Sequence, residues 1–420
     1  MKRRSHDRLV QTDRPSQPRR KTGGRLLTLG TLAMISLIVL TACGPEVDKP
    51  YSHISPESPM ANDIQSLYKL VFWLALAVFI GVQFAIVYTA LRFRRTRDSA
   101  TRPPQVHGNR RLEIMWTIIP AVVLLAILIP TITTLYDWSA AAEEGDIVVD
   151  VYGKQWWWEV HYGEDRAQNG QNLEVITANE LHLPEGKEAI IRLHTNNVIH
   201  SFWVPRLSGK MDLIPGHENV LSITPTESGE YYGECAEFCG TQHAWMRFKV
   251  IVEPEDQFYS WVNGYRAGNL GTTNPEAQLP AGVVRAPESL NLCLSCHAIN
   301  GVNEAALVGL EAPTNIGPNL TNLACRDTLA AGMLVNTEEN LRTWIHNPGG
   351  VKPGNYMADV ITEGLVRETY GEEGFDELIQ YLMSLRPPQG CDNENPGAVP
   401  AASPVASPVA PPVVVTDPAG

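Results

Sequence analysis

Three long apolar stretches lie in the first third of this 420-residue chain. The first, Leu26 to Ala42, has 17 residues, whereas Leu70 to Leu91 and Ile114 to Tyr136 have 22 and 23 residues without a charge. At about 1.5 Å per residue, each of the two longer stretches can cross a hydrocarbon core of about 30 Å. We therefore predict a transmembrane helical hairpin over residues 67–138.

From about residue 146 the pattern changes to short runs of alternating apolar and polar residues. Examples are DIVVDVYGKQWWWEV (146–160) and MRFKVIVE (246–253), and Gly, Pro and Asn residues separate such runs. A period of two is typical of half-buried β-strands, and turn residues at this spacing indicate antiparallel pairing. Residues 146–254 are predicted to form an antiparallel β-sandwich.

The last part of the chain has a third kind of pattern. Residues 263–285 are rich in Gly, Pro and Asn without periodicity, which predicts a linker. Residues 286–391 form the next predicted domain. Residues 392–420 repeat Pro, Ala, Val and Ser, cannot bury a core, and are predicted to be a disordered tail. An amphipathic helix is predicted near the end of the domain over residues 286–391. Its apolar residues at helical spacing are Phe375, Leu378, Ile379 and Leu382.

The first apolar stretch has the features of an export signal. It follows an arginine-rich leader and ends in LTAC, with small residues before a break. LTAC resembles a bacterial lipobox, in which Cys43 is lipidated and becomes the mature N-terminus. An uncleaved anchor helix is the alternative. We predict a lipoprotein-type signal peptide over residues 1–42 and an external segment over residues 43–66.

Charge sets the expected orientation. The loop RFRRTRDSATRPPQVHGNRR (92–111) holds seven arginines and one aspartate, which places it in the cytoplasm by the positive-inside rule. We therefore predict a multi-pass protein of the bacterial plasma membrane, with everything after residue 140 outside the cytoplasm. Without residues 1–42 the chain has 24 basic against 44 acidic residues. This balance rules against a nucleic-acid partner and suits a basic protein partner.

The stretch GECAEFCGTQHAWM (233–246) gathers metal-ligand side chains, and His200 lies upstream. Thiolate, imidazole and a weak axial thioether are the ligands of copper in cupredoxins. A second thiolate four positions after the first lets two sulfurs bridge two copper ions. A disulfide would leave His200, His243 and Met246 unexplained, and a zinc site would have no use for Met246.

The pattern C-A-E-F-C-G-x-x-H-x-x-M, with VIHSFWVP, KMDLIPG and HGNRRLEIMWTIIP, resembles subunit II of cytochrome c oxidase over about residues 60–254. The resemblance implies a cupredoxin-like domain with a binuclear copper centre, CuA. It also implies that the Glu237 carboxylate faces subunit I and helps to bind magnesium, and that Trp156 is the surface site where electrons arrive from cytochrome c. The implied copper ligands are His200, Cys235, the backbone carbonyl of Glu237, Cys239, His243 and Met246.

A second motif, LNLCLSCHAING (290–301), contains the c-type heme attachment sequence C-x-x-C-H. Cys293 and Cys296 would bind heme c covalently and His297 would bind its iron; a redox C-x-x-C is the alternative, but it has no need of His297. IGPNL (316–320) and VKPGNYMAD (351–359) resemble class I cytochrome c domains, which are all-α. By that resemblance the Pro318 carbonyl supports His297.

The second iron ligand is predicted to be Met357. It lies about sixty positions after C-x-x-C-H in a Pro/Gly loop, and thioether ligation raises the iron potential, as an electron carrier requires. Met333 and Met383 are the other downstream candidates. Two further thiols, Cys325 and Cys391, flank the domain and are expected to pair as a disulfide in an oxidising compartment, with free thiols as the alternative.

Together these features predict a multidomain membrane protein that resembles subunit II of a heme-copper terminal oxidase with a fused cytochrome c domain. The resemblance implies that an external donor protein reduces heme c, that CuA is reduced next, and that subunit I reduces O2 to water coupled to proton translocation. The predicted partners are subunit I, other oxidase subunits, the donor and membrane lipid. This chain lacks the intramembrane histidines that oxygen chemistry requires.

Three alternatives fit less well. Quinol oxidase subunit II shares the helices and sandwich, but that family has lost the copper ligands. Nitrous oxide reductase needs a histidine-rich domain that eleven scattered histidines do not supply. A copper-delivery lipoprotein would need neither a heme nor six converging ligands.

Overall fold

The computed structural model describes residues 51–94, 108–138, 147–165, 171–266, 284–300, 302–303, 317–387 and 391. The predicted signal peptide, Cys43 and the C-terminal tail lie outside these residues, as do most of the arginine-rich loop and most of the predicted linker. All described residues belong to one compact unit, Pro50–Gly420.

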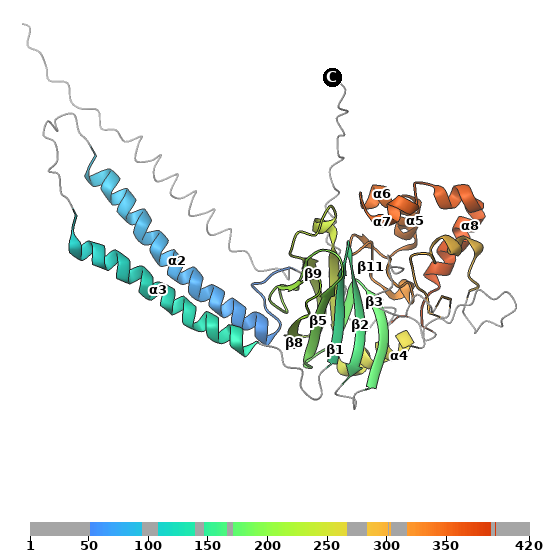
Figure 1. Cartoon of the computed structure of the whole chain (residues 1–420), viewed down its shortest axis with the longest axis horizontal. Helices are drawn as coiled ribbons and strands as arrows, with labels where there is room; N and C mark the ends of the chain where they lie inside the picture. The colour runs from blue at the N-terminus through green and yellow to red at the C-terminus, as the bar shows by residue number, and fades with distance from the viewer. Residues whose placement is uncertain are drawn as a thin grey trace, which may run out of the picture. The chain divides into compact units, whose positions relative to one another are not determined.

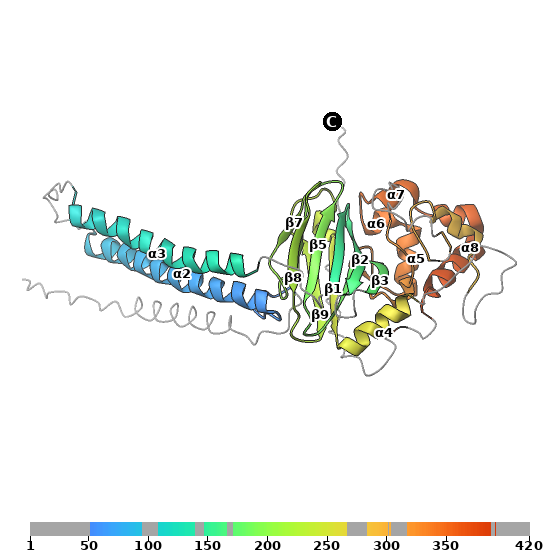
Figure 2. The same ribbon diagram turned by 60° about the horizontal axis from the view of Figure 1, so that its bottom comes forward.

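Two long helices, α2 (Pro59–Arg92) and α3 (Arg110–Asp137), lie side by side (Figures 1 and 2). Both are long and apolar enough to cross a membrane. Helix α2 begins earlier than the predicted hairpin, because Ser58 caps it: the Ser58 hydroxyl accepts a 3.0 Å hydrogen bond from the Ala61 N–H. Residues 59–66, predicted as part of an external segment, are therefore helical.

Ten strands form two five-stranded sheets, which confirms the predicted β-sandwich (Figure 2). One sheet has the order β3-β2-β1-β5-β8 and the other β4-β10-β9-β6-β7. The strands are β1 (Ile147–Lys154), β2 (Trp157–Asp165), β3 (Gln171–Ala178), β4 (Glu180–Pro184), β5 (Ala189–Thr195), β6 (His200–Trp203), β7 (Met211–Leu213), β8 (Asn219–Ile223), β9 (Gly229–Cys235) and β10 (Arg247–Glu253).

The prediction of purely antiparallel pairing is wrong for two strand pairs. Strands β1 and β5 are parallel, and so are β4 and β10. Parallel neighbours need a long crossover connection, and here whole strands of the sandwich supply it. The alternation of apolar residues sets which face of a strand is buried, but it carries no information about the direction of the neighbouring strand.

The core between the sheets also receives one face of a helix, α4 (Glu255–Arg266), that was not predicted. Residues 263–266, predicted as linker, are its last turn. The helix forms because Phe258, Val262 and Tyr265 share one apolar face and are buried against the sandwich. The helix was not predicted because its apolar residues are few and a Gly-rich sequence follows them directly.

The C-terminal part has its own apolar core, and its longest elements are helices. A two-stranded ribbon, β11 (Thr328–Leu329) and β12 (Leu334–Val335), departs from the all-α prediction. The four apolar positions predicted for the closing helix are all buried in α8. The helices and short 3₁₀ turns are η3 (Glu288–Leu292), η5 (Leu323–Cys325), α5 (Glu338–His346), α6 (Pro348–Val351), α7 (Tyr356–Val360) and α8 (Leu365–Met383).

A disulfide joins Cys325 to Cys391, 66 positions apart. Replacing both cysteines by serine is expected to destabilise the C-terminal part by about 4 kcal/mol, because a cross-link of this span removes entropy from the unfolded chain. Thermal unfolding followed by circular dichroism measures the change. The double variant should also stop responding to a reductant, and an unchanged unfolding midpoint would contradict the cross-link.

Candidate metal centre

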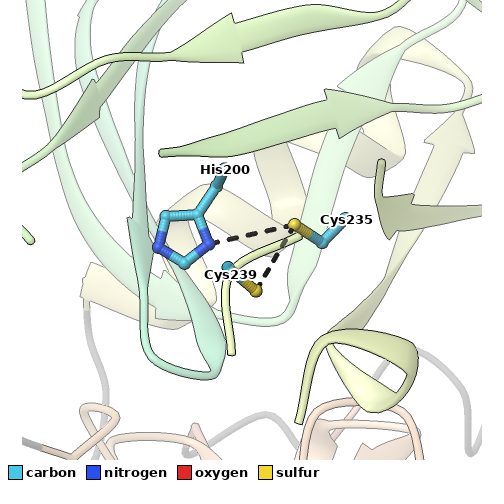
Figure 3. A group of neighbouring side chains, drawn as sticks. All are labelled: His200, Cys235 and Cys239. Atoms are coloured by element: carbon cyan, nitrogen blue, oxygen red, sulfur yellow. Dashed lines mark hydrogen bonds between the residues drawn. The ribbon is translucent and has the colours of Figure 1, made fainter. Parts of the chain in front are cut away.

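Two neighbouring strands bring together residues that are 35 positions apart. His200 begins β6 and Cys235 ends β9, and these strands pair antiparallel with Phe202 opposite Cys235. Cys239 follows in the loop after β9. The ligand atoms of His200, Cys235 and Cys239 all lie within 4.8 Å of one another, and Figure 3 shows the three side chains pointing toward one another. All three are buried.

The two sulfur atoms are the centre of a larger group of donors. Cys235 Sγ lies 3.7 Å from Cys239 Sγ, 3.8 Å from His200 Nδ1 and 3.2 Å from the Glu237 carbonyl oxygen. Cys239 Sγ lies 3.7 Å from His243 Nδ1 and 3.8 Å from Met246 Sδ. The structure thus brings together the whole predicted ligand set around two cysteines that form no disulfide.

The surroundings of this group fit a metal. A Cβ atom on Gly153 would lie 2.9 Å from the His200 ring, so a glycine in β1 leaves the room that the imidazole needs. The hydrogen bond between the two sulfurs lowers the pKa of the Cys235 thiol to about 3. The same bond, together with burial, raises the pKa of Cys239. Two sulfurs this close to each other could together hold soft cations.

The aromatic residues of QWWWEV hold the ligand loop in place. Trp156 Nε1 and Gln155 Nε2 both donate to the Cys239 carbonyl, at 3.0 and 2.8 Å. Trp156 is only 9% exposed, because the Tyr356 ring stacks on it at 5.3 Å between centroids. Trp156 is therefore largely covered in this structure, and its role as the site where electrons arrive stays a prediction. No local pattern could reveal a cover that lies 200 positions away.

A cavity of about 560 Å³ lies beside this loop. His297 Nδ1 is 2.7 Å from the Pro318 carbonyl, and burial lowers the pKa of His297, so a neutral ring keeps Nε2 free to bind a metal. A Cβ atom on Gly317 would lie 2.5 Å from this ring. Among the described methionines, Met357 lines the cavity, whereas Met333 and Met383 do not. Four predicted heme-binding residues line it: Cys293, Cys296, His297 and Met357.

Lys352 was not singled out from the sequence. It is the only lysine in residues 286–391 and lies in VKPGNYMAD, a signal that could have found it. Burial lowers its pKa to about 7. Its Nζ nevertheless has three backbone carbonyl acceptors, and only the charged amine has three hydrogens to donate to them.

Comparisons with known proteins identify the family. Two family models match, "Cytochrome C oxidase subunit II, transmembrane domain" over residues 55–134 and "Cytochrome C oxidase subunit II, periplasmic domain" over residues 147–253. "Cytochrome c oxidase subunit 2" of Alkalihalophilus pseudofirmus is 35% identical over 372 residues, which cover 87% of this chain and 98% of the relative. The chain belongs to the cytochrome c oxidase subunit II family.

Two further relatives with known sequences agree with this assignment. "Cytochrome c oxidase subunit 2" of Bacillus sp. strain PS3 is 33% identical, covering 83% of this chain and 94% of the relative. The protein of the same name from Bacillus subtilis is 31% identical, covering 86% and 98%. A crystal structure of the periplasmic domain of oxidase subunit II from Bradyrhizobium japonicum is 28% identical and covers 29% of this chain and 95% of that chain, with a TM-score of 0.26.

As subunit II of a heme-copper oxidase, the chain is a membrane protein with an extracellular domain and a partner of subunit I. The oxidase subunit II sandwich and the buried His/Cys group make its metal centre a CuA-type copper site. The oxidase takes part in electron transport as a cytochrome c oxidase. The regions that the two family models match reach no further than residue 253, before the C-x-x-C-H motif at residues 293–297.

Proposed function

We propose that an external donor protein delivers electrons to a heme c in residues 286–391, and that they leave through the copper centre to subunit I. Subunit I then reduces O2 to water, coupled to proton translocation. The observation that carries this proposal is the convergence of four further donor groups on two free sulfurs, beside a cavity lined by the residues of C-x-x-C-H. Bound copper and heme iron would supply the one-electron chemistry.

In the sandwich, Cys235 and Cys239 would hold two copper ions as bridging thiolates. His200 and His243 would bind through their Nδ1 atoms, which face these sulfurs. The Met246 thioether and the Glu237 carbonyl complete the set. Ligands fixed on paired strands and buried from water move little, so the arrangement favours electron transfer over bond chemistry.

In the C-terminal part, Cys293 and Cys296 would attach the heme through thioether bonds. His297 would bind the iron, oriented by the Pro318 carbonyl, and Met357 would be the second ligand. The full-length alignments support a shared C-terminal domain. They cover 83 to 87% of this chain, which cannot be contained in residues 55–253.

The remaining expectations concern the membrane and subunit I. Glu237 is exposed although its carbonyl faces Cys235, and the neighbouring Phe238 is 75% exposed. We propose that this face meets subunit I and that the Glu237 carboxylate helps to bind magnesium there. Both long helices would cross the plasma membrane, with lipid on Cys43 as a further anchor.

Metal analysis of the isolated, fully loaded subunit tests this function. We expect two copper atoms and one heme iron per chain, and the heme should stay attached after denaturation because two thioether bonds hold it. Elemental analysis and a denaturing gel stained for heme give the two numbers. One copper atom, or a heme that dissociates on denaturation, would contradict the proposal.

A further inference from the structure

We propose that the ring pair Tyr356–Trp156 is the electron connection between the heme-binding part and the copper ligand loop, and that Lys352 is the positioning residue that holds it. The inference rests on the proposed function, since it needs both redox groups. Three residues that are not metal ligands, Trp156, Tyr356 and Lys352, then take part, and Tyr356 of the same chain is the partner of Trp156.

The ring pair joins the two ligand sets through short contacts. Tyr356 directly precedes Met357, and its ring stacks on Trp156 at 5.3 Å with an interplanar angle of 19°. Trp156 Nε1 donates at 3.0 Å to the carbonyl of Cys239. Gln155 supports both ends, because its Oε1 accepts from the Tyr356 hydroxyl at 3.2 Å and its Nε2 donates to Cys239. Packed side chains therefore connect Met357 to Cys239.

Lys352 fixes the loop that carries Tyr356. Its side chain is buried, with the whole residue 4% exposed. Its Nζ donates to the carbonyls of Trp156 at 3.0 Å, Trp245 at 3.1 Å and Ala330 at 3.3 Å. Trp156 and Trp245 belong to the sandwich, whereas Ala330 belongs to the C-terminal part. A buried amine is stable only with its hydrogens satisfied, so these acceptors define one position for the loop.

Further contacts keep the two parts docked. The Glu180 carboxylate at the start of β4 accepts from the backbone N–H groups of Asp327 and Thr328 at 2.8 and 3.3 Å. Lys249 on β10 forms a 2.9 Å ion pair with Asp327. In the ligand loop, Gln242 donates to the Pro353 carbonyl. Several hydrogen bonds and an ion pair therefore hold the sandwich against the C-terminal part.

The proposed step is the transfer of one electron. Its source would be the ferrous heme iron that His297 and Met357 would hold, which would become ferric, and its acceptor would be the copper pair that Cys235 and Cys239 would hold, which would be reduced. No bond forms or breaks and no proton moves. Tyr356 and Trp156 keep their oxidation states and only fill the gap with packed atoms. Because Trp156 is covered, the external donor must reach the heme-binding part instead.

The test uses the purified complete oxidase with Lys352→Met and Tyr356→Leu. A light-activated reductant injects one electron into heme c, and absorbance follows its passage to CuA. We expect each variant to slow this step severalfold, because Tyr356→Leu removes the stacked ring and Lys352→Met removes the three hydrogen bonds that hold the loop. The heme c spectrum, the heme potential and the CuA spin signal should not change.

Two matched variants separate the connection from general stability. Tyr356→Phe keeps the ring and should transfer electrons at the wild-type rate. Lys187→Met removes a half-exposed lysine paired with Glu255 and should also behave as wild type. If Lys352→Met lost a redox group, the comparison of Tyr356→Leu with Tyr356→Phe would still show whether the ring contact is needed for electron transfer.

The outcomes distinguish this inference from the proposed function. Unchanged rates in Tyr356→Leu, with both centres loaded, overturn the connection and leave the function intact. Equal slowing in Tyr356→Leu and Tyr356→Phe overturns the role of the ring contact. A wild-type subunit without covalent heme or without two copper atoms overturns the proposed function itself.

Discussion

Replacing Cys235 by serine is expected to abolish the two-copper centre. The sulfur of Cys235 is the atom that lies close to His200, Glu237 and Cys239 at once. A hydroxyl is a poor ligand for copper and cannot bridge two ions as a thiolate does. Losing a partner of a ligand typically costs about 10–100-fold in metal affinity, so losing the bridge itself should cost more. Electron spin resonance of the purified oxidase measures the mixed-valence signal.

Two controls accompany this measurement, one in the same variant and one in a second variant. The heme c spectrum should remain, because Cys293 packs against a separate apolar core and Cys296 lies in the same C-x-x-C-H motif. Thr241→Ser changes an exposed side chain of the same loop and should leave the copper signal intact. A normal mixed-valence signal in Cys235→Ser would show that the coppers are held elsewhere.

Replacing Met357 by leucine is expected to lower the potential of heme c while the heme stays covalently attached. Thioether ligation raises the iron potential, and axial ligands set heme potentials over a range of roughly 0.8 V. The cavity favours Met357 because this residue lines it together with His297. A redox titration followed by optical absorption measures the shift.

Met383→Leu is the matched control for this change. Met383 packs against the same helical core but does not line the cavity among the described residues, so the potential should stay at the wild-type value. An unchanged potential in Met357→Leu would point to another ligand. A shift in Met333→Leu would then identify it.

Much of this molecule could be predicted from its sequence because the information is local. The two long helices follow from unbroken apolar length, and the sandwich follows from alternation with a period of two. All predicted copper ligands except His200 fall within residues 235–246, and the predicted heme motif falls within five residues. Residues that are close together in the sequence are then also close together in the folded structure.

The features that could not be predicted depend on contacts between distant segments. The parallel pairing of β1 with β5 and the burial of α4 depend on which surfaces meet, and periodicity does not encode this. The contact of Lys352 with Trp156 spans 196 positions. A lysine is ordinarily exposed, so its burial follows only from the three carbonyls that receive it.

The contact between Tyr356 and Trp156 joins two parts of one polypeptide, and this sets the kinetic order expected for electron transfer between them. Two partners joined in one polypeptide have no diffusional encounter, so this step is first order and does not depend on protein concentration. Dissolved salt screens exposed charges far more than buried contacts, so ionic strength acts on the arrival of the outside reductant rather than on the internal hop. Under the proposed function, the excess of acidic residues after residue 42 would act in recruiting that reductant, and the packing between the two parts would set the rate of the internal hop.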